Sequence, residues 1–107
     1  MKRRPGEIEG DGDVLDALAA AIAALRGSVE VRAFLEDLCT PAELEAMTDR
    51  WRVVPLLIDG VPYREIHDRT QVSVTTIGRV ARFLERGYGG YRIAADRVLP
   101  PAAEAAP

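Results

Sequence analysis

The sequence predicts an all-α protein, and three observations support this prediction. Apolar residues recur at spacings of three and four along most of the chain, which is the period of an amphipathic helix. No segment alternates apolar and polar residues for long enough to indicate a strand. The chain has 107 residues, 48% hydrophobic and 29% charged, which is typical of one globular domain. We expect this domain to span residues 13–98, between a disordered tail at 1–12 and a disordered Pro/Ala tail at 99–107.

Two helices are expected at the start of the domain. The first covers about 14–26, is capped by Asp13 and carries one apolar stripe, formed by Leu15, Leu18, Ile22 and Leu25. Gly27 ends this helix, and Ser28 can cap a second helix that reaches Cys39. Such continuous stripes need a large partner surface, while one Trp, two Phe and three Tyr give little bulk for a core. A helical homodimer is therefore favoured, with a compact monomeric bundle as the alternative.

A third helix is expected from Pro41 to about Asp59. Thr40, Pro41 and Glu43 form a capping box with a proline at the first helical position. The apolar spacing continues through Leu44, Met47, Trp51, Val54 and Ile58. Pro55 lies inside this helix and removes a hydrogen bond at a cost of up to about 3 kcal/mol, so we expect a kink there, or an end and a restart.

A helix-turn-helix motif is expected within residues 62–86, which we call the reading head. Its two helices cover about 62–69 and 73–86, and a last turn follows at 93–98. The motif needs five apolar residues to share a small core, namely Ile66, Val72, Ile77, Val80 and Leu84. The second helix is then capped by Ser73 and directs five residues outward, namely Val74, Thr75, Gly78, Arg79 and Arg82.

Charge is distributed unevenly along the chain. Residues 1–49 carry 5 basic and 11 acidic side chains, whereas residues 50–97 carry 9 and 5, and all nine of those bases are arginine. The net charge of −3 therefore hides a basic half, whose local field can attract phosphates. Arginine suits phosphates and guanine edges, although high-GC coding would enrich it as well.

Several classes of protein are excluded or disfavoured. The longest apolar stretch, residues 17–25, is far shorter than the roughly 20 residues of a membrane span. The N-terminus has no apolar stretch of a secretory signal, and the lone Cys39 suits a reducing compartment, so we expect a cytoplasmic protein. His67 lies beside two carboxylates, but no nucleophile, metal quartet or phosphate loop accompanies it. We expect no enzymatic activity, no cofactor and no metal.

More than half of the chain, from about Leu35 to Tyr91, resembles the Trp repressor superfamily, and within it the TrpR-like branch of the YerC/YecD type. The resemblance rests on five segments taken together: residues 38–46 (LCTPAELEA), Arg50 with Leu56-Leu57-x-x-Gly60, residues 63–66 (YREI), Val72-Ser73-x-x-Thr76-Ile77-x-Arg79-Val80, and residues 89–91 (GGY). The resemblance implies an intertwined all-α dimer whose two reading heads enter successive major grooves of double-stranded DNA.

The resemblance also implies a candidate effector pocket. In the Trp repressor, tryptophan is held by polar positions that correspond here to Thr40, Arg50 and Arg79. The small residues that make room for the indole correspond to Val80 and Phe83, and a leucine of the pocket wall corresponds to Asp37. We therefore expect a filled pocket, with Phe83 as a built-in plug, and a protein that does not respond to tryptophan.

Three residues depart from the usual pattern of the motif. Gln71 occupies the turn position where glycine with a positive φ is usual, at a cost of roughly 1 kcal/mol. His67 stands where a small residue is usual, and Thr70 replaces an apolar residue. From these departures we expect a less stable reading head.

Two functions remain at this point. The first is a dimeric DNA-binding regulator of transcription that reads a palindromic operator, with Val74, Thr75 and Gly78 near bases and Arg64, Arg79 and Arg82 near phosphates. The second is a helical interaction module that kept the fold and lost DNA binding. The acidic first half and the irregular turn motivate this alternative.

Overall fold

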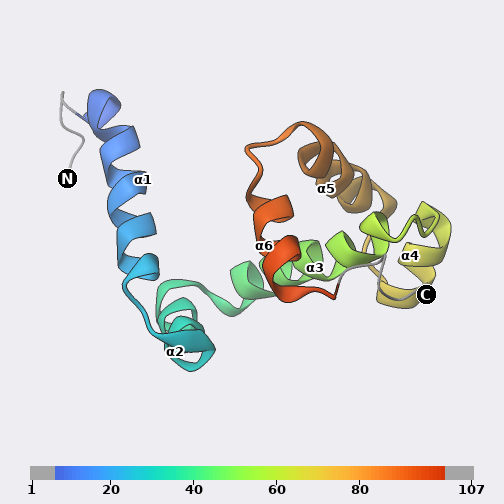
Figure 1. The fold of residues 1–107 in the computed structure, drawn as a ribbon, viewed down its shortest axis with the longest axis horizontal. Helices are drawn as coiled ribbons and strands as arrows, with labels where there is room; N and C mark the ends of the chain where they lie inside the picture. The colour runs from blue at the N-terminus through green and yellow to red at the C-terminus, as the bar shows by residue number, and fades with distance from the viewer. Residues whose placement is uncertain (1–6, 101–107) are drawn as a thin grey trace. The chain divides into compact units, whose positions relative to one another are not determined.

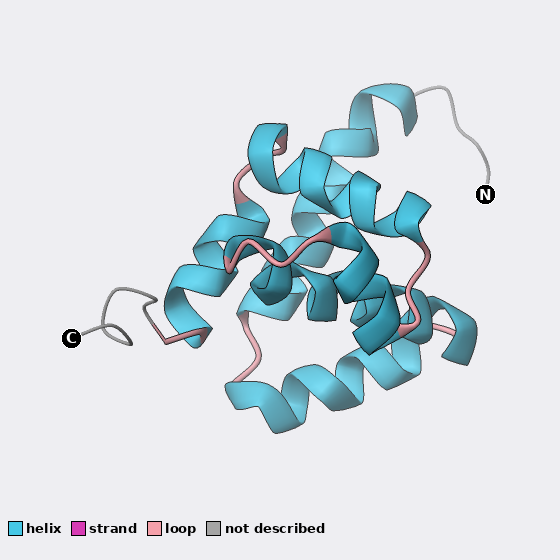
Figure 2. Ribbon diagram, turned by 90° about the vertical axis from the view of Figure 1, so that its right-hand side faces the viewer, coloured by secondary structure: helices cyan, strands magenta, loops and turns pink. Residues whose placement is uncertain are grey.

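A computed structural model describes residues 7–100 of the chain, which form six α-helices joined by short loops (Figures 1 and 2). This described part contains no strand, as the sequence predicts. The chain divides into two compact units, residues 1–41 and 42–107. Residues 1–6 and 101–107, which include most of the two expected tails, lie outside the described residues.

The first unit contains α1 (Glu7–Ala23) and α2 (Gly27–Leu38). α1 begins earlier than predicted, so Asp13 lies within the helix and residues 7–12 are helical instead of part of a tail. The local sequence is acidic, which favours the positive end of a helix dipole. The prediction for Ser28 is wrong: the cap residue of α2 is Arg26, whose backbone N–H donates to Glu30 Oε1 at 2.7 Å.

α3 (Pro41–Ile58) begins at the predicted proline. It runs through Pro55 without ending, so of the two expected outcomes, a kink or an end and restart, the second does not occur. The helix ends at Ile58, and Gly60 follows it with a φ of 79°. The N–H of Gly60 donates to the Leu57 carbonyl at 3.0 Å and the N–H of Val61 to the Leu56 carbonyl at 3.0 Å, which is a Schellman motif.

Three shorter helices complete the second unit: α4 (Tyr63–Thr70), α5 (Val74–Arg86) and α6 (Gly90–Val98). α4 and α5 lie where the sequence predicts the two helices of the motif. α6 is longer than the single turn expected at 93–98, because it begins directly after Gly89. Leu99, the first residue of the expected Pro/Ala tail, packs against the core.

The core of the described chain lies in the second unit. All five residues predicted to share the core of the motif are buried, and they are joined by three residues of α3 and α6: Val53, Val54 and Ala95. Trp51 packs against this cluster, as its place in the apolar stripe indicates. Thr70 is the one buried polar residue of the described chain, with 9% of its surface exposed. No helix between residues 7 and 100 is long and apolar enough to cross a membrane.

Candidate nucleic-acid interface

The helix-turn-helix is formed by α4, residues 71–73 and α5. α5 packs against α4 on one side and against α6 on the other, as the ribbon also shows (Figure 1). The first residue of α4, Tyr63, lies beside Gly78 in the middle of α5, where a Cβ atom added to the glycine would lie 3.9 Å from the tyrosine ring. The two helices therefore approach each other closely at the end of α4 that is farthest along the chain from the turn.

The turn adopts the strained backbone that its sequence predicts. Gln71 has a φ of 65° and is the one residue other than glycine with a positive φ in residues 7–100. Its N–H donates to the His67 carbonyl at 2.7 Å, and its side-chain amide donates to the Asp68 carbonyl at 3.0 Å. The left-handed conformation required by the motif is thus retained without glycine.

Ser73 caps α5, as predicted. Its Oγ accepts the backbone N–H of Thr76 at 3.1 Å and donates to Thr76 Oγ1 at 3.0 Å. This cap satisfies one N–H of the first turn and leaves the positive end of the helix dipole next to Val74 and Thr75, both exposed. A phosphate near this end would be stabilised by the same dipole.

The outward face of α5 carries the predicted residues. Val74 is 52% exposed, Thr75, Arg79 and Arg82 are exposed, and Gly78 is half-buried beside Tyr63. The small residues Val74, Thr75 and Gly78 come before the two arginines along the helix. In this order, α5 presents small residues near its N-terminus and positive charge further along the helix.

Three arginines of the reading head form no salt bridge within the described part of the chain. Arg64, at the start of α4, is exposed, and neither it nor Arg79 nor Arg82 forms a salt bridge with any residue between 7 and 100. By contrast, Arg69 of α4 pairs with Glu65 one turn earlier. Three guanidinium groups of the reading head are therefore available to an anion.

A small hollow of about 290 Å³ brings together most of the expected effector pocket. It is lined by Arg50 of α3, by Arg79, Val80 and Phe83 of α5, and by Tyr91 of α6. The fifth expected residue, Thr40, belongs to the first unit, and its part in the pocket stays a prediction. Phe83 is 48% exposed and is one of the residues that line the hollow, and its role as a plug stays a prediction.

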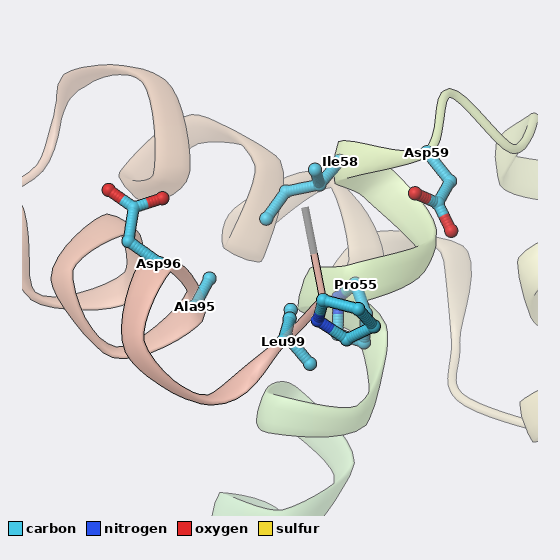
Figure 3. A pocket seen from close by; sticks show the side chains of 7 residues that line it. Pro55, Ile58, Asp59, Ala95, Asp96 and Leu99 are labelled. Carbon is cyan, nitrogen blue, oxygen red and sulfur yellow. The ribbon is translucent and has the colours of Figure 1, made fainter. Parts of the chain in front are cut away.

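A second hollow, of about 360 Å³, lies between the end of α3 and α6 (Figure 3). Ile58, Ala95 and Leu99 form its apolar surface, and the carboxylates of Asp59 and Asp96 lie on opposite sides of it. Carboxylates repel phosphate, so this hollow does not belong to a nucleic-acid surface. Among residues 7–100 no group of three His, Cys, Asp or Glu side chains could hold a metal ion.

Sequence reasoning missed three side chains around the reading head. Tyr63 lies against Gly78, Tyr91 lines the arginine hollow, and Arg52 of α3 reaches the carbonyl of Thr70 at the end of α4, at 3.5 Å. Tyr63 and Tyr91 both fall within the motifs quoted for the family resemblance, which was the available signal. Arg52 had no such signal, because its contact joins residues far apart in the chain.

The fold and this surface define an all-α helix-turn-helix protein with a basic recognition helix. The family model described as "Trp repressor protein" matches residues 13–99. The chain belongs to the Trp repressor family. It is 38% identical over 87 residues to the uncharacterised protein YerC of Bacillus subtilis (strain 168), an alignment that covers 81% of this chain and 84% of YerC.

A solved structure supports the same assignment. The chain matches the structure named "Crystal structure of a putative Trp repressor from Staphylococcus aureus" with a TM-score of 0.75 and 33% sequence identity. The match covers 89% of this chain and 94% of the other. The predicted family and the predicted all-α, Trp repressor-like fold are thus confirmed, and membership of this family indicates a DNA-binding regulator.

Proposed function

We propose that the protein is a sequence-specific regulator of transcription, acting as a repressor, that reads a palindromic operator in double-stranded DNA as a homodimer. One observation carries this proposal. The recognition helix α5 is capped at its N-terminus and exposes small side chains in its first turns, followed by Arg79 and Arg82, which are exposed and form no salt bridge with residues 7–100. This is the surface that a helix needs to enter a major groove with phosphates on either side.

The roles of the side chains follow from their size and charge. Val74 and Thr75 carry methyl groups that can contact thymine, and Gly78 lets the helix approach the base edges closely. Arg64, Arg79 and Arg82 neutralise phosphates and fix the register of the helix. The dipole at the end of α5 capped by Ser73 adds a further attraction for a phosphate.

A homodimer accounts for the apolar surface of the first unit. Val14 and Leu15 are 66% and 65% exposed, and α2 contains no buried residue. Short amphipathic helices derive most of their stability from burying their apolar face. A second copy of the chain offers that burial, and its two-fold axis would set two reading heads against two half-sites of a palindrome.

The hollow between Arg50 and Arg79 is the candidate site for a small-molecule effector. Two guanidinium groups and the rings of Phe83 and Tyr91 suit an anion with an apolar body. The hollow is lined by three residues of α5, so an occupant could shift the recognition helix. Phe83 and Val80 take the place of the small residues of the tryptophan repressor, and we infer that tryptophan is not the effector.

No membrane, cofactor or catalytic chemistry is part of this proposal. We also propose that the protein is cytoplasmic, which is compatible with membership of a DNA-binding family. The candidate residues for DNA contact all lie on α4, on α5 or at the cap between them. Each is a small, polar or cationic residue, and its proposed role is binding.

The proposal is tested by selecting fragmented genomic DNA on the purified protein, with no ligand added. Enrichment of one inverted repeat is expected, and a double variant, Arg79→Ala with Arg82→Ala, is expected to lose it while keeping its helical circular dichroism. The variant is a suitable control because neither arginine forms a salt bridge with another described residue.

The interaction-module alternative predicts a different result. Such a module would enrich no repeat, with or without cell-extract metabolites, and any partner it bound would be insensitive to the two arginine substitutions. Enrichment that appears only with metabolites would instead indicate a ligand-gated regulator and would direct attention to the hollow beside Arg79.

A further inference from the structure

The turn of the helix-turn-helix holds a conformation that its own sequence disfavours. A glutamine at a φ of 65° is strained, because its Cβ crowds the backbone in the left-handed region. Glycine would adopt this conformation freely. Something in the surrounding structure must therefore hold Gln71 in place, since the direction of α5 depends on it.

Two side chains of α4 hold the residue that follows Gln71. The Nδ1–H of His67 donates to the Val72 carbonyl at 2.8 Å. The backbone N–H of Val72 donates to Thr70 Oγ1 at 3.1 Å. Both backbone polar groups of Val72 are thus bound by side chains from the other side of the turn, while its own side chain is buried.

Thr70 is fixed in turn by its neighbours. Its hydroxyl donates to the Ile66 carbonyl at 2.7 Å and is buried, so it is oriented to accept the N–H of Val72. The Thr70 carbonyl accepts the long 3.5 Å contact from Arg52 of α3. The turn is therefore linked by side chains both to α4 and to the helix that forms the scaffold of the second unit.

Two departures from the usual motif, His67 and Thr70, are the two residues that form these bonds. A small residue at 67 and an apolar residue at 70 could make neither bond. The three unusual residues of the turn thus form one set: Gln71 introduces strain, and the other two compensate for it.

We propose that His67 is a positioning residue for DNA recognition, which together with Thr70 takes over the role of a turn glycine by holding both backbone polar groups of Val72. His67 acts through the turn: its bond fixes where α5 begins, and so where Val74 and Thr75 meet the groove. This inference rests on the proposed DNA-binding function, and its test includes a measurement that does not require DNA.

The test uses the full-length chain with substitutions at positions 67 and 71. His67→Leu removes the donor, whereas His67→Asn keeps an N–H the same number of bonds from the backbone as Nδ1. Gln71→Gly removes the strain, alone and together with His67→Leu. Ala94→Gly is the control, because it weakens α6 through backbone entropy and leaves the turn untouched.

Affinity is measured by fluorescence anisotropy with the duplex recovered in the selection experiment. His67→Leu is expected to raise Kd about tenfold, the order of one lost hydrogen bond. When Gln71→Gly is already present, the same substitution is expected to raise Kd by less than about threefold, because glycine holds the turn without the two side-chain bonds. His67→Asn is expected to stay within about threefold of the wild type, and Ala94→Gly likewise.

Native-state hydrogen exchange gives the measurement that is independent of DNA. His67→Leu is expected to speed exchange of the Val72, Thr76 and Ile77 amides, while the Val54 amide in α3 keeps its rate. If the wild-type protein binds no duplex, the proposed function fails and this measurement still tests the role of His67 in the turn. An equal effect of His67→Leu with and without Gln71→Gly, or unchanged exchange at Val72, overturns the inference.

Discussion

Tyr63 and Gly78 face each other across the helix-turn-helix: a Cβ atom added to Gly78 would lie 3.9 Å from Tyr63 Cε2, which is an ordinary van der Waals distance. The protein itself therefore leaves room for a methyl group in the middle of α5. A glycine within a helix is nevertheless less favourable than alanine. We attribute the glycine at position 78 to the proposed close approach of α5 to the base edges of DNA.

Gly78→Ala is accordingly expected to stabilise the fold and weaken DNA binding. The free energy of unfolding should rise by about 0.5–1 kcal/mol, from the helix preference of alanine. The affinity for the selected duplex should fall, because the methyl group adds bulk beside Tyr63, where α5 is proposed to approach the base edges. Urea unfolding and anisotropy measure the two effects. A variant that binds as tightly as the wild type would remove Gly78 from the interface.

Ser73→Ala is expected to lower the free energy of unfolding by about 1 kcal/mol, because the N–H of Thr76 loses its acceptor. Ser28→Ala provides a matched control. Ser28 lies inside α2, whose cap residue is Arg26, so its loss should change stability by less than about 0.5 kcal/mol. Equal effects of the two substitutions in urea unfolding would contradict the capping geometry.

Arg82→Ala is expected to reduce the salt dependence of DNA binding. Each phosphate contact contributes about 0.9 to the slope of log K against log salt, so the slope should become shallower by about 1. Arg32→Ala is the control, because Arg32 lies on α2 and pairs with Glu36. The slope is obtained from titrations at several salt concentrations, and an unchanged slope would exclude Arg82 from phosphate contact.

Leu15→Asp is expected to disrupt the homodimer. Light scattering should give twice the chain mass of 11.7 kDa for the wild type and the single-chain mass for the variant. The control is Ala20→Asp, which places the same charge on α1 outside the apolar stripe. Leu15 is chosen because it is 65% exposed in one chain. A wild-type protein that is monomeric at micromolar concentration would refute the proposed dimer.

Tryptophan at millimolar concentration is expected to change the affinity for the duplex by less than about twofold. The reason is that Phe83 and buried Val80 line the hollow beside Arg79, at the positions of the small residues that make room for the indole in the Trp repressor. Titration with and without the amino acid measures this. Tenfold tighter binding of the duplex in the presence of tryptophan would contradict this prediction and would indicate that tryptophan is the effector.

The local features of the fold were predictable because each depends on neighbours in the sequence. The proline start of α3, the Ser73 cap and the positive φ at Gln71 all follow from short motifs and are all observed. The five core residues of the reading head also follow from helical spacing. The reading head is therefore the part of the chain that the sequence determines most directly.

Other features depend on contacts that helical periodicity does not encode. Val53 is fully buried although it lies outside the apolar stripe of α3, which indicates only one face of the helix. The true start of α1 could not be read from Asp13, because a good cap residue is also tolerated within a helix. From the sequence alone, His67 and Thr70 are expected to weaken the motif. Their hydrogen bonds to Val72 could not be predicted, because these bonds form only in the folded turn.

Trp51, packed against the core of the second unit, is the single tryptophan of the chain, and all three tyrosines also lie beyond residue 41. Near-ultraviolet absorption and intrinsic fluorescence therefore report almost entirely on the unit that carries the reading head. The first unit contributes helical circular dichroism and is otherwise spectroscopically silent. Comparing the two signals during one denaturation experiment separates melting of α1 and α2 from melting of the reading head, without any added label.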